Sequence, residues 1–169
     1  KNGFRVLDSD LHTMEPDALW EQYLDEPFKK FAPRFTRRAD GSVNQPVIRI
    51  GEVEIAEMSK RARTAVVGKS LQERSFARHP HYVVAHARGY DSATHLQAMD
   101  IEGIDVAVIY GTRGRQVLMH DDLDPKVASA LARAHNNWTR DFCSIDPSRL
   151  KFAAQVAFHD IPGAIAEAR

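Results

Sequence analysis

Three ionisable residues near the start of the chain have the types and spacing of a metal site. The segment VLDSDLHTMEP, residues 6–16, places Asp8, Asp10 and His12 at alternate positions. Alternate residues of a β-strand share one face and lie roughly 6.5 Å apart along it, so the three side chains are predicted to project together. A divalent cation would pair with such a carboxylate and imidazole, whereas the alternative is a strand end exposed to solvent.

Further polar residues are expected near the same edge. Arg113 follows the apolar segment 104–110 and could hold a substrate carboxylate with its fork of donors, or it could be a surface-loop arginine. His159 ends the segment 152–158 and could bind substrate at the same edge, or cap a helix, or face solvent. Glu15 could face the metal, although we favour a role near a helix N-terminus.

An alternation of strands and helices must position these residues. Short apolar segments predict strands, and residues spaced by three or four predict helices that follow them. The predicted strands are 4–9, 104–110 and 152–158, and the predicted helices are 16–24, 92–102, 125–144 and one that begins at Asp160. Such alternation is typical of an α/β fold with a parallel sheet, whose functional groups gather beyond the carboxyl ends of the strands.

Residues 25–90 interrupt this alternation. Residues 47–55 predict a β-hairpin with Gly51 in its turn. Seven basic residues and one acidic residue lie between Met58 and Tyr90. We interpret 25–90 as an irregular insertion that could cover a site.

The composition excludes several classes of protein. The 169 residues include 23 basic and 23 acidic side chains, so the formal charge of zero argues against nucleic acid and membrane surfaces as partners. The single cysteine, Cys143, excludes an intrachain disulfide and is compatible with a reducing compartment. No apolar run reaches the length of a membrane span, so a cytoplasmic location is the expectation.

Several sequence motifs resemble the amidohydrolase-related family of metal-dependent TIM-barrel enzymes. They occur in family order and leave about residues 25–90 uncovered. These motifs are VLDSDLHTMEP, HLQAMDIEGIDVAVIY at 95–110, and AHNNW at 134–138 with DPSRL at 146–150. The branch that they resemble includes aminocarboxymuconate-semialdehyde decarboxylase and related aromatic-acid decarboxylases.

The resemblance implies a (β/α)₈ TIM barrel, of which residues 1–169 look like the N-terminal three β/α units. It implies a divalent metal, zinc in the first place and manganese as the alternative, held in part by Asp10 and His12. The family usually has His-x-His here. Decarboxylases of the branch often carry a carboxylate at the first position, so Asp10 favours a decarboxylase over an amidase. The implied reaction is hydrolysis or non-oxidative decarboxylation of a small carboxylated or cyclic substrate.

Some residues of the site that the resemblance implies have no counterpart in this sequence. The remaining metal ligands and the acid/base residue would lie on later strands, so the catalytic residues are unknown. The last helix has no stop signal, and we expect it to continue past Arg169. The rest of a barrel, or a homo-oligomer, is the expected partner. A non-catalytic binding or assembly unit, completed by another chain, is the competing hypothesis.

Overall fold

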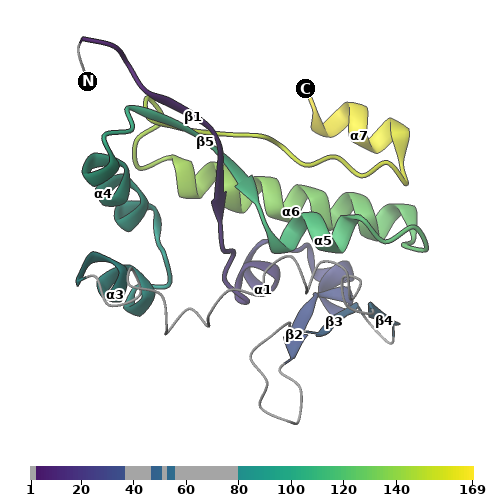
Figure 1. The fold of residues 1–169 in the computed structure, drawn as a ribbon. Helices are drawn as coiled ribbons and strands as arrows, with labels where there is room; N and C mark the ends of the chain where they lie inside the picture. Colours follow the sequence, from purple (N-terminus) through teal and green to yellow (C-terminus); the bar gives the residue numbers. More distant parts are fainter. Residues whose placement is uncertain (1–2, 37–46, 51–52, 56–79) are drawn as a thin grey trace, which may run out of the picture.

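A three-stranded parallel sheet forms the centre of the molecule (Figure 1). The computed structural model describes residues 3–36, 47–50, 53–55 and 80–169. The strands are β1 (Leu7–Thr13), β5 (Val106–Gly111) and β6 (Leu150–Phe152), hydrogen-bonded in the order β1-β5-β6. Both pairs are parallel, which confirms the prediction of an α/β fold with strands adjacent in chain order.

Helices cover one face of this sheet. The helix α4 (Ser92–Glu102) directly precedes β5, and α6 (Pro125–Cys143) directly precedes β6 in the chain. Side chains from both helices pack in one cluster with the buried strand residues; this cluster contains Met99, Ala107, Ile109, Cys143 and Leu150. The pKa of the Cys143 thiol is raised to about 11 by burial, so the thiol stays protonated in this core.

A second cluster packs on the other side of α6. It includes residues of α1 (Leu19–Tyr23) and α5 (Arg113–Leu118), with the short 3₁₀ helix η1 (Glu26–Phe31) packed beside them. The apolar stripe predicted for the helix 125–144 lies in this cluster; its members are Val127, Leu131, Ala134, Trp138 and Phe142. The helix begins where predicted because Asp124 accepts hydrogen bonds from the backbone N–H groups of Lys126 and Val127.

The third strand, Leu150–Phe152, begins two residues before the predicted 152–158 and shares only Phe152 with it, so the predicted position was wrong. The backbone N–H of Ala153 still donates to Ile109, but the chain then leaves the sheet. The side-chain amide of Asn136 accepts from the N–H of Gln155 and donates to its carbonyl, both at 2.8 Å. These hydrogen bonds satisfy the Gln155 backbone outside the described sheet, and the apolar pattern alone could not reveal them.

The first strand begins later than the predicted 4–9 and contains a β-bulge. Asp8 pairs with Ala107 but Leu11 pairs with Ile109, so β1 has one extra residue between these pairs. The Asp8 carboxylate accepts the backbone N–H of Asp10 at 2.9 Å within this bulge. The prediction that Asp8 shares a face with Asp10 and His12 was therefore wrong, because the bulge places Asp8 in line with Leu11 on the helix-covered face.

The predicted insertion contains more regular structure than expected. The strands β2 (Arg34–Thr36), β3 (Val47–Ile50) and β4 (Val53–Ile55) form a small antiparallel sheet, which confirms the predicted hairpin. The helix α3 (Pro80–Ala87) precedes α4. Residues 51–52, with Gly51, and 56–79, with most of the basic residues, lie outside the described part of the chain.

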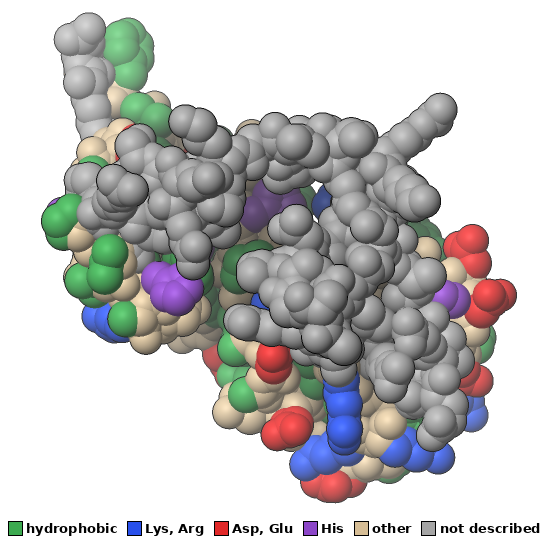
Figure 2. Space-filling model, turned by 60° about the horizontal axis from the view of Figure 1, so that its bottom comes forward, with side chains coloured by type: hydrophobic (Ala, Val, Ile, Leu, Met, Phe, Trp, Pro, Cys, Tyr) green, Lys and Arg blue, Asp and Glu red, His purple; other side chains and the backbone are tan. Residues whose placement is uncertain are grey.

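Charged side chains of both signs lie on the face of the molecule shown in Figure 2. Figure 2 shows acidic and basic side chains intermixed where described residues are visible on this face. None of the described helices has the length and apolar character needed to cross a membrane. The last helix, α7 (Ile161–Glu167), ends at Glu167 and is capped by Asp160, which accepts from the Gly163 N–H.

Candidate functional site

Asp10 and His12 lie together in the carboxyl-terminal half of β1. Their side chains are 81% and 41% exposed, and the Asp10 Oδ1 atom is 3.6 Å from the His12 Nε2 atom. The other ring nitrogen of His12, Nδ1, is 3.3 Å from the Thr112 hydroxyl, which follows β5. The ring of Tyr110, the residue paired with His12, lies 6.1 Å away.

The spacing of Asp10 and His12 fits two ligands of one metal ion. Donor atoms about 2.0–2.2 Å from a tetrahedral ion are separated from each other by about 3.3–3.6 Å. The observed separation of 3.6 Å agrees with this range. In the described part of the chain, no group of three or more His, Cys, Asp or Glu residues could hold an ion, so this pair would be only part of a site.

A second carboxylate–histidine pair lies buried behind the same end of the sheet. Glu15 and His135 have side chains only 1% exposed, and the Glu15 Oε1 atom is 3.0 Å from the His135 Nε2 atom. The Glu15 carboxylate also accepts the backbone N–H groups of Arg113 at 2.9 Å and Gly114 at 3.0 Å. We call Glu15, His135 and these two amides the Glu15 cluster.

The contacts of Glu15 keep its carboxylate ionised. Burial alone would raise the pKa of Glu15, but the hydrogen bonds from His135, Arg113 and Gly114 outweigh it and lower the pKa below its ordinary value. Because an ionised carboxylate only accepts hydrogen bonds, His135 Nε2 carries the proton that lies between the two side chains. The cluster is therefore a fully paired unit that joins the end of β1, the start of α5 and the middle of α6.

Two glycines make room for this cluster. A Cβ atom on Gly111 would lie 2.3 Å from His135 Nε2, and one on Gly114 would lie 2.2 Å from His135 Cδ2. The sequence analysis did not connect Gly111 or Gly114 with His135. The available signal was a glutamate, Glu15, shortly after β1, together with two closely spaced glycines, Gly111 and Gly114, at the end of β5 and the start of α5.

The predicted substrate-binding residues have structural contacts. The Arg113 guanidinium donates to the Asp17 carboxylate at 2.6 Å and to the Glu15 carbonyl at 3.2 Å. His159 lies in the turn before α7, where its Nε2 atom is 2.7 Å from the His120 carbonyl oxygen. The structure brings Asp10 and His12 together, and substrate roles for Arg113 and His159 stay predictions.

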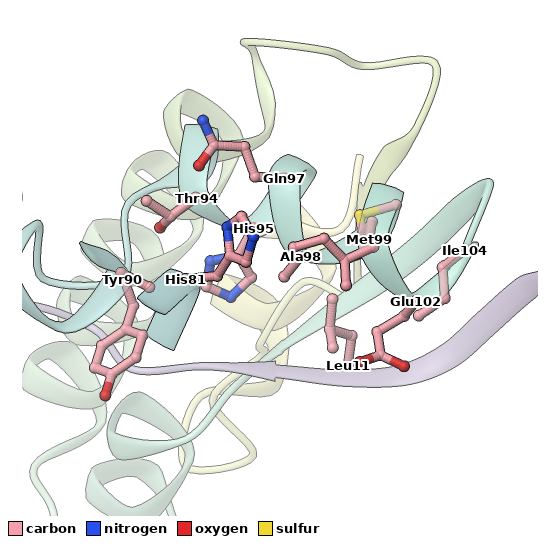
Figure 3. Close-up of a pocket in the computed structure, with 12 residues that line it drawn as sticks. Leu11, His81, Tyr90, Thr94, His95, Gln97, Ala98, Met99, Glu102 and Ile104 are labelled. Atoms are coloured by element: carbon pink, nitrogen blue, oxygen red, sulfur yellow. The ribbon is translucent and has the colours of Figure 1, made fainter. Parts of the chain in front are cut away.

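A cavity of about 500 Å³ lies beside the sheet, between α3, α4 and β1 (Figure 3). Leu11 and Met99 give it an apolar wall, and His81, His95 and Glu102 also line it. Leu11 and His12 are neighbours whose side chains alternate across β1, so the cavity lies behind the strand face that carries His12. It is therefore separate from the Asp10–His12 pair.

Comparison with known proteins finds a structural relative of this fold but no relative by sequence. No family model matches the sequence, and no curated protein matches it either. A crystal structure of an amidohydrolase from Mycobacterium avium subsp. paratuberculosis K-10 matches with a TM-score of 0.65 at 20% identity, over 98% of this chain and 46% of that chain. The chain shares its fold with part of an amidohydrolase.

The extent of this match agrees with the topology. The chain spans less than half the length of the matched amidohydrolase, and it has three parallel strands that alternate with helices. A complete (β/α)₈ barrel has eight such strands. At 20% identity the match establishes the fold and leaves the activity to be argued from the site.

Proposed function

We propose that this chain contributes to the active site of a divalent-metal-dependent enzyme that hydrolyses or decarboxylates a small carboxylated or cyclic organic substrate. The observation that carries the proposal is the Asp10–His12 pair, with donor atoms 3.6 Å apart on the exposed face of the first strand. Functional groups of barrel enzymes gather at the carboxyl ends of the strands, where this pair lies.

The residues of the chain have distinct roles in this proposal. Asp10 and His12 would hold the ion, zinc in the first place and manganese as the alternative, and the ion would polarise a substrate oxygen or an attacking water. Asp10 supplies negative charge, and His12 offers Nε2 while its Nδ1 atom faces the Thr112 hydroxyl. Tyr110 lies next to His12 on the same face and would present its ring to a cyclic substrate.

The rest of the site would come from outside the described strands. In the described sheet β1 and β6 are the edge strands, and each pairs with β5 on one side only. Unpaired edges of a buried parallel sheet call for further strands, which would supply the other metal ligands and the acid/base residue. We propose the remainder of a barrel, from the same or another polypeptide, as the partner that completes the site.

Metal analysis tests this proposal. The protein expressed from its full reading frame should contain a stoichiometric divalent ion, and His12→Ala should lose the ion and the activity but stay folded. His86→Ala, on the exposed side of α3, is the matched control and should retain both. An active, metal-loaded His12→Ala variant would contradict the proposal, and a folded wild-type protein that binds no metal would favour a non-catalytic assembly unit.

A further inference from the structure

The Glu15 cluster lies one residue away from the group that contacts His12. Glu15 accepts the backbone N–H groups of Arg113 and Gly114, the first residues of α5. Thr112 directly precedes them, and its hydroxyl is 3.3 Å from His12 Nδ1. A continuous set of contacts therefore leads from the buried carboxylate to the exposed imidazole.

The way in which α5 is capped explains why the Thr112 hydroxyl can face His12. A threonine at the residue before a helix ordinarily turns its hydroxyl toward the first free backbone N–H groups. Thr112 occupies this position before α5 but makes no side-chain capping hydrogen bond. Glu15, from another segment of the chain, takes these N–H groups instead and leaves the threonine hydroxyl for the histidine.

The surroundings hold this arrangement in place. Glu15 is anchored by His135, and both side chains are only 1% exposed. Gly111 and Gly114 lie so close to the His135 ring that the loop between them has little room to shift. His12, by contrast, is 41% exposed, and the loop at Thr112 supplies its hydrogen bond from β5.

We infer that Glu15 is a positioning residue for His12, acting through the loop 111–114. In this arrangement His12 Nδ1–H donates to Thr112 Oγ1, which fixes the ring and directs the Nε2 lone pair to the open face. Hydrogen-bond partners behind a ligating histidine typically contribute 10–100-fold in metal affinity. The expected effect on metal affinity rests on the proposed metal-binding role of His12. The expected effect on the orientation of the His12 ring does not depend on a metal.

Zinc affinity tests the inference in the protein expressed from its full reading frame. Thr112→Val and Glu15→Gln should each weaken Zn²⁺ binding about 10-fold, whereas Thr112→Ser, which keeps the hydroxyl, should bind as the wild type does. Because both changes act through one loop, the double variant should be no weaker than the weaker single variant. Asp17→Asn, at the exposed carboxylate that Arg113 contacts, is the control and should have no effect.

Two outcomes of the affinity measurements would overturn the inference. One is wild-type affinity in Glu15→Gln or in Thr112→Val. The other is a double variant about 100-fold weaker than the wild type, which would make the two residues independent. If Glu15→Gln does not fold, Glu15→Asp, which keeps the charge but shortens the reach to the two amides, replaces it in the same comparison.

The orientation of His12 gives a readout that does not depend on metal. Three-bond couplings of the metal-free protein should show one χ1 rotamer for His12 in the wild type, and averaged rotamers in Thr112→Val and Glu15→Gln. A single unchanged rotamer in these variants would reject the positioning role. Loss of the proposed function itself would be recognised separately, because wild-type protein would then bind Zn²⁺ no better than His12→Ala while the rotamer result still stood.

Discussion

Two carboxylate–histidine pairs in the described part of the chain differ in exposure, in spacing and in hydrogen bonding. Asp10 and His12 are exposed, their nearest donor atoms are 3.6 Å apart, and His12 Nδ1 lies 3.3 Å from the Thr112 hydroxyl. Glu15 and His135 are buried, their nearest side-chain atoms are 3.0 Å apart, and Glu15 also accepts hydrogen bonds from two backbone amides. The buried pair is fully hydrogen-bonded, whereas the exposed pair has donor atoms open to solvent.

Among the changes that test this difference, removal of Glu15 should have the largest effect on the free energy of unfolding. Glu15→Ala would leave two buried backbone amides and His135 without their acceptor, so we expect the free energy of unfolding to fall by about 3–5 kcal/mol. Urea unfolding at neutral pH measures the change. A loss below about 1 kcal/mol, the range of an exposed pair, would show that burial does not distinguish the two pairs.

Addition of a methyl group beside His135 should have the next largest effect. Gly114→Ala would place a Cβ atom 2.2 Å from His135 Cδ2, and such overpacking typically costs about 1–3 kcal/mol. Gly89→Ala is the control, because a Cβ there meets nothing within 4 Å and only the positive φ of 65° is strained. Equal thermal stability of the two variants would contradict the close packing of the cluster.

Acid should weaken the buried pair. The folded-state pKa of Glu15 is lowered from its ordinary value of 4.5, so its stabilising contribution is fully present above that value and is lost as the pH falls through the folded-state pKa. The difference in unfolding free energy between the wild type and Glu15→Gln should therefore shrink below about pH 4.5. A difference that stays constant on acidification, in urea titrations across this range, would argue against an ionised Glu15.

Changes at the exposed pair should have the smallest effect on stability. Asp10→Ala and His12→Ala remove side chains that are 81% and 41% exposed, and we expect each to change the unfolding free energy by less than about 0.5 kcal/mol. The same urea titrations measure it. A loss above 2 kcal/mol in either variant would make this pair structural and would remove the reason for assigning it a ligand.

Periodicity predicted the fold well where apolar patterns are long. The stripe of α6 and the continuous apolar segment of β5 are both formed by local spacing, and both lie where the sequence predicts them. The end of β6 could not be predicted in this way, because the Gln155 backbone is hydrogen-bonded to the side chain of Asn136, 19 residues earlier in the sequence. A contact of this kind depends on the tertiary structure.

The candidate site was predictable only in part for a similar reason. Asp10 and His12 are two residues apart, so their proximity follows from strand geometry. His135 is 120 residues from Glu15, and nothing in the local sequence joins them. The bulge also escaped prediction, because the alternating polar residues from Asp8 to His12 have the pattern of an unbroken strand.

The extra residue in β1 has a consequence for how the gene can change. Asp8 and Leu11 pair with Ala107 and Ile109, alternate residues on one face of β5, so deletion of one codon between Asp8 and Leu11 would remove the extra residue and leave Leu11 on the helix-covered face and His12 on the open face. Deletion of one codon in a regular part of the strand would instead turn every following side chain to the opposite face. We expect the length of β1 to vary during evolution at the bulge more readily than elsewhere in the strand.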